Sequence, residues 1–197
     1  MPNTISFNPA LTTSPYPNFL ASTRGAVQGT FDDDPSSRMW LMQGQVVSGA
    51  TLPLYGGLPI TELTPAATGS DLLGPIVQLA TANANVTGFT VFNQGHNMLM
   101  TPSNLVPQSS GGMSVMFFRM GSGARIWVGV DSGVAGAVDG NAINTTVYWD
   151  YTNNVLNNTG TGALAVKVLK LNTTCKTITV TSNLANWATG TCALIQI

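Results

Sequence analysis

Short runs of alternating apolar and polar residues recur along most of the chain. The clearest are residues 45–47, 88–93, 113–120, 125–130, 145–151, 163–171, 176–181 and 192–197. Alternation with a period of two is typical of strands that bury one face. Turn signals such as Gly111-Gly112, Asp139-Gly140 and Asn153-Asn154 separate the runs. The pattern predicts an all-β fold, an antiparallel β-sandwich or barrel that is jelly-roll-like.

Residues 71–85 are ambiguous between helix and strand. Leu72, Leu73, Ile76 and Val77 form part of a passable helical stripe, but Pro75 falls inside it. A proline in a helix interior removes a hydrogen bond and clashes with the preceding turn. We therefore predict a turn followed by a strand from Ile76, with a short helix as the alternative.

The first 45 residues differ from the rest of the chain. They contain five prolines, at positions 2, 9, 15, 17 and 35, and also the large apolar residues Phe7, Tyr16 and Phe19. Disordered tails are usually poor in such residues. An extended N-terminal arm that packs on its own body or on a neighbour fits better than a free tail. We predict an arm over residues 1–45 and a β body over residues 46–197.

Charge is scarce in this chain. Its 197 residues include 7 Lys and Arg against 8 Asp and Glu, whereas Thr, Asn and Ser number 25, 17 and 14. The net charge of −1 without a basic run argues against nucleic-acid and polybasic membrane-surface binding. No apolar stretch approaches the roughly 18 residues that span a bilayer, and no signal peptide is expected. So neutral a surface suits self-assembly or docking on a large partner.

Candidate catalytic and metal-binding groups are few. His96 is the single histidine, and Asp32-Asp33-Asp34 is the single acidic run, without the spacing of a calcium loop. Glu62 is the only glutamate, so a carboxylate pair for glycoside hydrolysis is improbable on composition. Cys175 and Cys192 are most simply small buried residues. We expect no enzymatic activity, no metal and no cofactor.

The Gly121-Ser-Gly123 segment is rich in glycine but does not match a phosphate-binding loop. Gly129 and Gly133 follow it at too loose a spacing, and no helix is expected after it. We interpret it as a turn.

The four tryptophans divide by context. Trp127 and Trp149 lie within apolar runs and are expected in the core. Trp40 lies beside Met39, where the arm meets the body, and is either an interface anchor or a core residue.

Three blocks resemble the cement (decoration) proteins of tailed-bacteriophage heads, together covering roughly residues 45–130. The first is Thr51-Leu-Pro-Leu-Tyr-Gly-Gly-Leu-Pro-Ile-Thr-Glu62. The second joins Leu73-Gly-Pro-Ile-Val to Asn85-Val-Thr-Gly-Phe-Thr-Val-Phe-Asn-Gln-Gly-His-Asn97. The third is Gly112-Met-Ser-Val-Met-Phe-Phe-Arg-Met-Gly-Ser-Gly-Ala-Arg-Ile-Trp-Val128.

The resemblance implies a non-enzymatic β protein that coats and strengthens the outer capsid of a virion. Its partners would be the major capsid protein and further copies of itself, as a homodimer or homotrimer, after synthesis in the host bacterial cytoplasm. Candidate interface residues are Phe7, Tyr16, Phe19, Trp40 and Tyr55. The alternatives are a head-fibre, tail or host-attachment module that binds glycans, and a polysaccharide-degrading enzyme.

Overall fold

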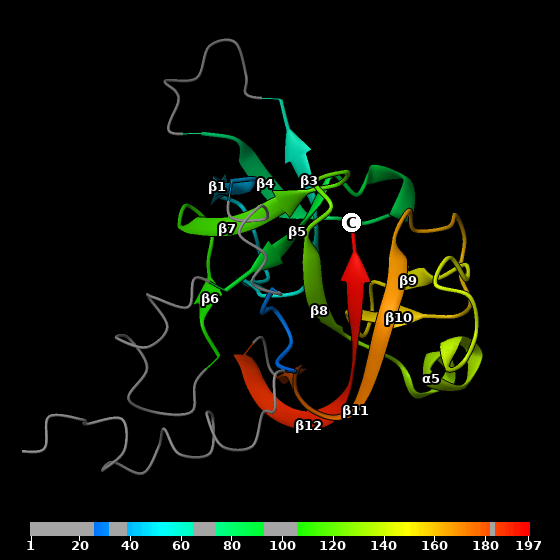
Figure 1. The fold of residues 1–197 in the computed structure, drawn as a ribbon. Coiled ribbons are helices and arrows are strands. Elements are labelled where there is room, and N and C mark those ends of the chain that lie inside the picture. Colours follow the sequence, from blue (N-terminus) through cyan, green and yellow to red (C-terminus); the bar gives the residue numbers. More distant parts are fainter. Residues whose placement is uncertain (1–25, 32–38, 65–73, 93–105, 182–183) are drawn as a thin grey trace, which may run out of the picture.

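The computed structural model describes residues 26–31, 39–64, 74–92, 106–181 and 184–197. These residues form mostly β-strands, with one α-helix and one short 3-10 helix among them. The all-β prediction is confirmed. Figure 1 shows a barrel beside a long curved hairpin, with a smaller hairpin and the helix on the far side of that long hairpin.

The barrel is closed and has five strands in the order β1-β4-β3-β5-β7. Their bounds are β1 (Leu41–Val46), β3 (Pro59–Leu63), β4 (Ile76–Leu79), β5 (Gly88–Val91) and β7 (Ser114–Arg119). The neighbouring strands are antiparallel except β1 and β4, which are parallel through Gln45↔Ile76 and Val46↔Val77. The barrel is therefore mixed, whereas a purely antiparallel arrangement was expected.

The ambiguous segment resolves as predicted, because β4 begins at Ile76. The carbonyl of Pro75 accepts a hydrogen bond of 2.9 Å from the backbone N–H of Gln45. Proline lacks a donor but keeps its acceptor, so it can stand at the start of a strand.

A second, three-stranded antiparallel sheet has the order β11-β12-β8. Its strands are β8 (Arg125–Gly129), β11 (Lys167–Thr181) and β12 (Leu184–Gln196). The runs at 163–171 and 176–181 were expected as separate strands but form one long strand. The register shifts between Asn172 and Cys175, so a β-bulge carries the chain through the polar stretch without ending the pairing.

Short elements complete the body. They are β2 (Leu54–Tyr55) paired with β6 (Gln108–Ser109), β9 (Tyr148–Asp150) paired with β10 (Val155–Asn157), η1 (Asn83–Asn85) and α5 (Ser132–Val138). The expectation of no helix after Gly121-Ser-Gly123 is wrong at α5. The carboxylate of Asp131 caps α5 by accepting from the N–H of Gly133 at 2.8 Å. A good cap and the buried Val134 and Val138 outweigh the two glycines inside the helix.

One hydrophobic core joins the barrel to one face of the three-stranded sheet. Phe89, Phe117 and Phe118 are fully buried barrel residues, and Ile126 and Ile195 join them from the sheet. The opposite face of the sheet carries a separate cysteine cluster of Ala26, Trp127, Cys175, Cys192 and Leu194. Trp127 and Trp149 are 7% and 4% exposed, which confirms that both are core residues.

Residues 26–31 belong to the body although they were assigned to the arm. Val27 forms a parallel bridge with Lys176 of β11, and Phe31 an antiparallel bridge with Ile126 of β8. Gly29 donates to the carbonyl of Trp127 and accepts from the N–H of Phe92, at 2.7 and 2.8 Å. This linking segment, residues 26–31, therefore ties the barrel side to the sheet. β1 also lies within the range predicted as arm, except for Val46.

Candidate functional site

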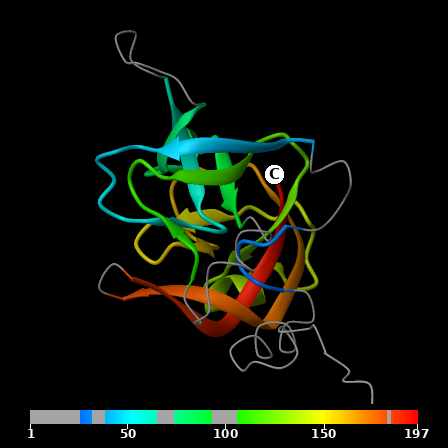
Figure 2. The ribbon, with the colours of Figure 1, turned by 90° about the vertical axis from the view of Figure 1, so that its left-hand side faces the viewer.

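The most exposed large apolar side chains form a pair just before β1. Met39 is 83% exposed and Trp40 is 60% exposed. Leu41, the next residue, pairs with Phe118, so the pair lies beside the end of β7. In Figure 2, β1 is the light-blue strand that crosses the upper part of the barrel. Trp40 is thus a surface residue and not a core residue.

Leu52 and Met113 are also exposed, with exposed fractions of 40% and 53%, and we treat them together as a second place. The carbonyl of Met113 accepts from the N–H of Val46, at the opposite end of β1 from Trp40. Leu52 lies in the loop between β1 and β2. Neither residue was predicted as an interface residue from the sequence, since alternation alone does not say which apolar side chains stay exposed.

The tip of the long hairpin provides a third exposed apolar place. Val180 and Leu184 are 40% and 44% exposed, and they belong to its last rungs, Val180↔Ala185 and Thr181↔Leu184. Within β12, only Cys192–Gln196 pair with β8, so the tip extends past the three-stranded part of the sheet. We call these three places the apolar contact points.

Tyr55, the other predicted interface residue in the described ranges, is buried. It is 4% exposed and belongs to the main core. Burial raises the pKa of its phenol to about 12. β2 pairs with β6, and the carbonyl of Tyr55 accepts from the hydroxyl of Thr90, which holds the residue inside. Its ring is therefore not part of the surface. The predicted interface residues Phe7, Tyr16 and Phe19 lie outside the described residues.

Three of the described acidic side chains, those of Glu62, Asp131 and Asp150, are engaged in local structure. Asp131 caps α5, and the carboxylate of Asp150 accepts from the backbone of Thr152 and the side chain of Asn153 at 2.8 and 2.7 Å. The hydrogen bond from Asn153 holds the pKa of Asp150 below its usual value. Glu62 forms an ion pair with Arg119. Within the described ranges, no three His, Cys, Asp or Glu residues gather in a way that could hold a metal ion. His96 and Asp32–34 lie outside these ranges.

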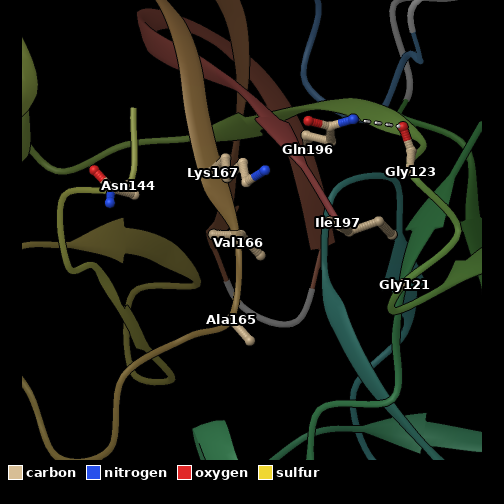
Figure 3. Close-up of a pocket in the computed structure, with 8 residues that line it drawn as sticks. All are labelled: Gly121, Gly123, Asn144, Ala165, Val166, Lys167, Gln196 and Ile197. Carbon is tan, nitrogen blue, oxygen red and sulfur yellow. Dashed lines mark hydrogen bonds between the residues drawn. The ribbon is translucent and has the colours of Figure 1, made fainter. Parts of the chain in front are cut away.

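An open hollow of about 450 Å³ lies between the start of β11 and the end of β12. Figure 3 shows the side chains around it, and the amide of Gln196 donates to the carbonyl of Gly123 at 3.4 Å. The lining comprises Gly121, Gly123, Asn144, Ala165, Val166, Lys167, Gln196 and Ile197. Among these lining residues, Lys167 carries the only ionisable side chain.

Comparisons with protein-family models, curated proteins and solved structures found no match to this chain. The resemblance to cement proteins therefore rests on the three sequence blocks. None of the helices among the described residues has the length and apolar character needed to cross a membrane.

Proposed function

We propose that this protein is a structural virion protein that binds the outer surface of a tailed-phage capsid. It acts there as a cement or decoration protein and stabilises the expanded shell by bridging neighbouring capsomers. The major capsid protein is its main partner, and copies of the chain associate as a dimer or trimer. The proposal starts from the three sequence blocks that resemble this family.

The observation that carries the proposal furthest is the exposed pair Met39 and Trp40 on a charge-poor β surface. Tryptophan and methionine are enriched at the centres of protein interfaces, and tryptophan is a frequent hot-spot residue. Leaving both side chains in water forgoes the free energy of burying them. A protein partner that covers the pair recovers that free energy.

The separation of the apolar contact points suits a partner that is larger than this chain. Leu52 and Met113 lie at the other end of β1, and Val180 and Leu184 at the hairpin tip. A small ligand cannot cover all three places, whereas a lattice of subunits can. Several modest contacts made together raise the effective concentration of each and bind far more tightly than any one alone.

Bridging stabilises a shell through differential affinity. A protein that contacts two adjacent capsomers binds best to a lattice whose spacing lets both contacts form. Binding therefore shifts the equilibrium toward that expanded lattice, by an amount that grows with concentration and affinity. No bond-making step is involved.

The test is an electron-microscopy reconstruction of the virus particle whose genome encodes this chain. A particle from a mutant that lacks the gene is the control. We expect density for the barrel and the long hairpin outside the shell, between capsomers, and its loss in the mutant. Adding the purified protein to mutant particles should restore the density and raise the temperature at which they release DNA.

Two other results would contradict the proposal. Density confined to a tail or fibre, together with binding to a glycan array, would assign the chain to a host-attachment module. Absence of the chain from purified particles would remove it from the virion altogether.

A further inference from the structure

The two cysteines are neighbours on one face of the β11–β12 hairpin. Cys175 pairs with Gly190, and Cys192 pairs with Asn172. Residues 190 and 192 point to the same face of their strand, so Cys175 and Cys192 are diagonal neighbours. The bulge between Asn172 and Cys175 alters the local register at this place. Within the bulge, the backbone N–H of Thr174 donates a hydrogen bond of 2.9 Å to the side-chain oxygen of Asn172.

The two thiols also influence each other's protonation. Their interaction lowers the pKa of Cys175 and raises the pKa of Cys192. Cys175 therefore loses its proton before Cys192. The Cys175 sulfur lies 3.1 Å from the carbonyl oxygen of Gly190, and the Cys192 sulfur 3.8 Å from that of Lys176. Both side chains are held by the hairpin itself.

Their surroundings leave the thiols only each other as reaction partners. Both are free cysteines, 3% and 0% exposed, within the cysteine cluster under Ala26 of the linking segment. Among the described residues no group of three possible metal ligands exists, so a thiolate metal site is not supported here. The lowered pKa of Cys175 raises its share of thiolate, which is the form that reacts with a small oxidant.

We propose that Cys175 and Cys192 form an intrachain disulfide when the folded protein meets a peroxide. The Cys175 thiolate attacks one oxygen of hydrogen peroxide, which breaks the O–O bond, gives a sulfenic acid and releases hydroxide. The sulfur of Cys192 then attacks the sulfenic sulfur, and water leaves with the remaining protons. In total two thiols and one peroxide give one disulfide and two waters.

The disulfide would fasten β11 to β12 between the sheet and the hairpin tip. A cross-link of two strands restricts the unfolded chain and leaves the paired strands in place. The modification would therefore fix the base of the hairpin that carries Val180 and Leu184. The formation of this disulfide does not depend on the proposed function, because both cysteines belong to the same chain.

Tryptic peptides offer a direct test. Cleavage after Lys170 and Lys176 places Cys175 in peptide 171–176 and Cys192 in peptide 177–197. The folded protein is treated with hydrogen peroxide, alkylated and digested without reductant. We expect the two peptides to appear as one linked species, about 2 Da lighter than their sum, which a reductant separates. The melting temperature should rise by roughly 5 °C.

Single variants and the unfolded chain serve as controls. Cys192→Ser should still be oxidised at Cys175 but yield no linked peptides, and Cys175→Ser should leave Cys192 unreacted. The link should form at least about tenfold faster in the folded protein than in urea, because the fold holds the thiols together. Two unlinked alkylated peptides after peroxide, a disulfide-linked dimer, or equal rates in urea would each overturn the proposal.

Discussion

The guanidinium of Arg119 on β7 and the carboxylate of Glu62 on β3 form a bidentate ion pair across β5, the strand between them. Nε lies 2.7 Å from Oε1, and Nη2 lies 2.8 Å from Oε2. The pair raises the pKa of Arg119, first through the hydrogen bond and then through the charge of Glu62. The chain has only 15 charged residues, and two of them join β3 to β7 at this place.

Removing this ion pair should weaken the barrel slightly. Glu62→Gln should lower the free energy of unfolding by about 0.5 kcal/mol, since Arg119 is half exposed and water screens the pair. A double-mutant cycle with Arg119→Met, followed by urea denaturation, isolates the coupling. The coupling should shrink in high salt; one that is salt-independent would mean that packing, not charge, joins the two residues.

Gly29→Ala should destabilise the protein strongly. A Cβ at Gly29 would lie 2.5 Å from the Cα of Gly56, and φ is +85° there. Both the clash and the left-handed backbone disfavour alanine, so we expect a loss of about 3 kcal/mol in chemical denaturation.

Gly112→Ala is the matched control for Gly29→Ala. Its φ is +82°, yet a Cβ would meet nothing within 4 Å. Only the backbone cost of about 1 kcal/mol should remain. Equal losses for the two variants would contradict the close packing of the linking segment against Gly56.

Stability should fall in alkaline solution because of buried phenols. Burial raises the pKa of Tyr55 and of Tyr151 to about 12, above the ordinary value of about 10. Below pH 10 the folded and the unfolded protein both keep these phenol protons. Between pH 10 and 12 the unfolded chain loses them while the folded protein keeps them, and this favours unfolding. Tyr55 alone should contribute a slope of about 1.4 kcal/mol per pH unit in that window.

Tyr55→Phe should remove that part of the alkaline slope while leaving the slope below pH 9 unchanged. Urea denaturation at a series of pH values measures both variants. A slope identical to that of the unmodified protein would show that the Tyr55 phenol is accessible in the folded state.

Trp40→Ala should affect binding but not folding. Trp40 is 60% exposed, so the free energy of unfolding should change by less than about 0.5 kcal/mol. Binding to decoration-free particles should weaken about tenfold or more if Trp40 is an interface anchor. Thr179→Ala, an exposed polar position on β11, is the control and should bind normally. Unaltered binding by the Trp40 variant would remove this residue from the interface.

Two truncations distinguish arm from body. Deleting residues 1–25 leaves residues 26–31 in place, so the shortened chain should still fold while particle occupancy falls. Deleting residues 1–31 also removes Val27 and Phe31 from β11 and β8, and should cost about 3 kcal/mol or more. Equal stability of the two truncated chains would contradict the role of the linking segment. Full occupancy after the shorter deletion would exclude the arm from binding.

Local alternation predicted the strands where it was dense. Residues 113–120 and 125–130 became β7 and β8 with small changes at their ends. β3 was missed because Pro59 stands at its start, a position that proline tolerates since its missing donor is not needed there. β11 is one continuous strand, but it was predicted as two because Asn172-Thr-Thr174 in its middle is as polar as a turn.

Pairing and exposure depend on the tertiary structure and were harder to predict. Period-two alternation does not say which strands are neighbours, so the parallel β1–β4 pair had no signal. Trp40 and Tyr55 are both aromatic residues near strand ends, yet one is exposed and one is buried. The difference comes from β6 and Thr90, which reach Tyr55 from distant parts of the chain. The proximity of the two cysteines likewise follows from the register of one hairpin.

The linking segment has a mechanical consequence. A force applied to the chain at residues 26–31 would act first on the backbone hydrogen bonds from Gln28 to Lys176 and from Gly29 to Trp127. These bonds join the segment to β11 and β8, so the load would be shared between two strands of the sheet.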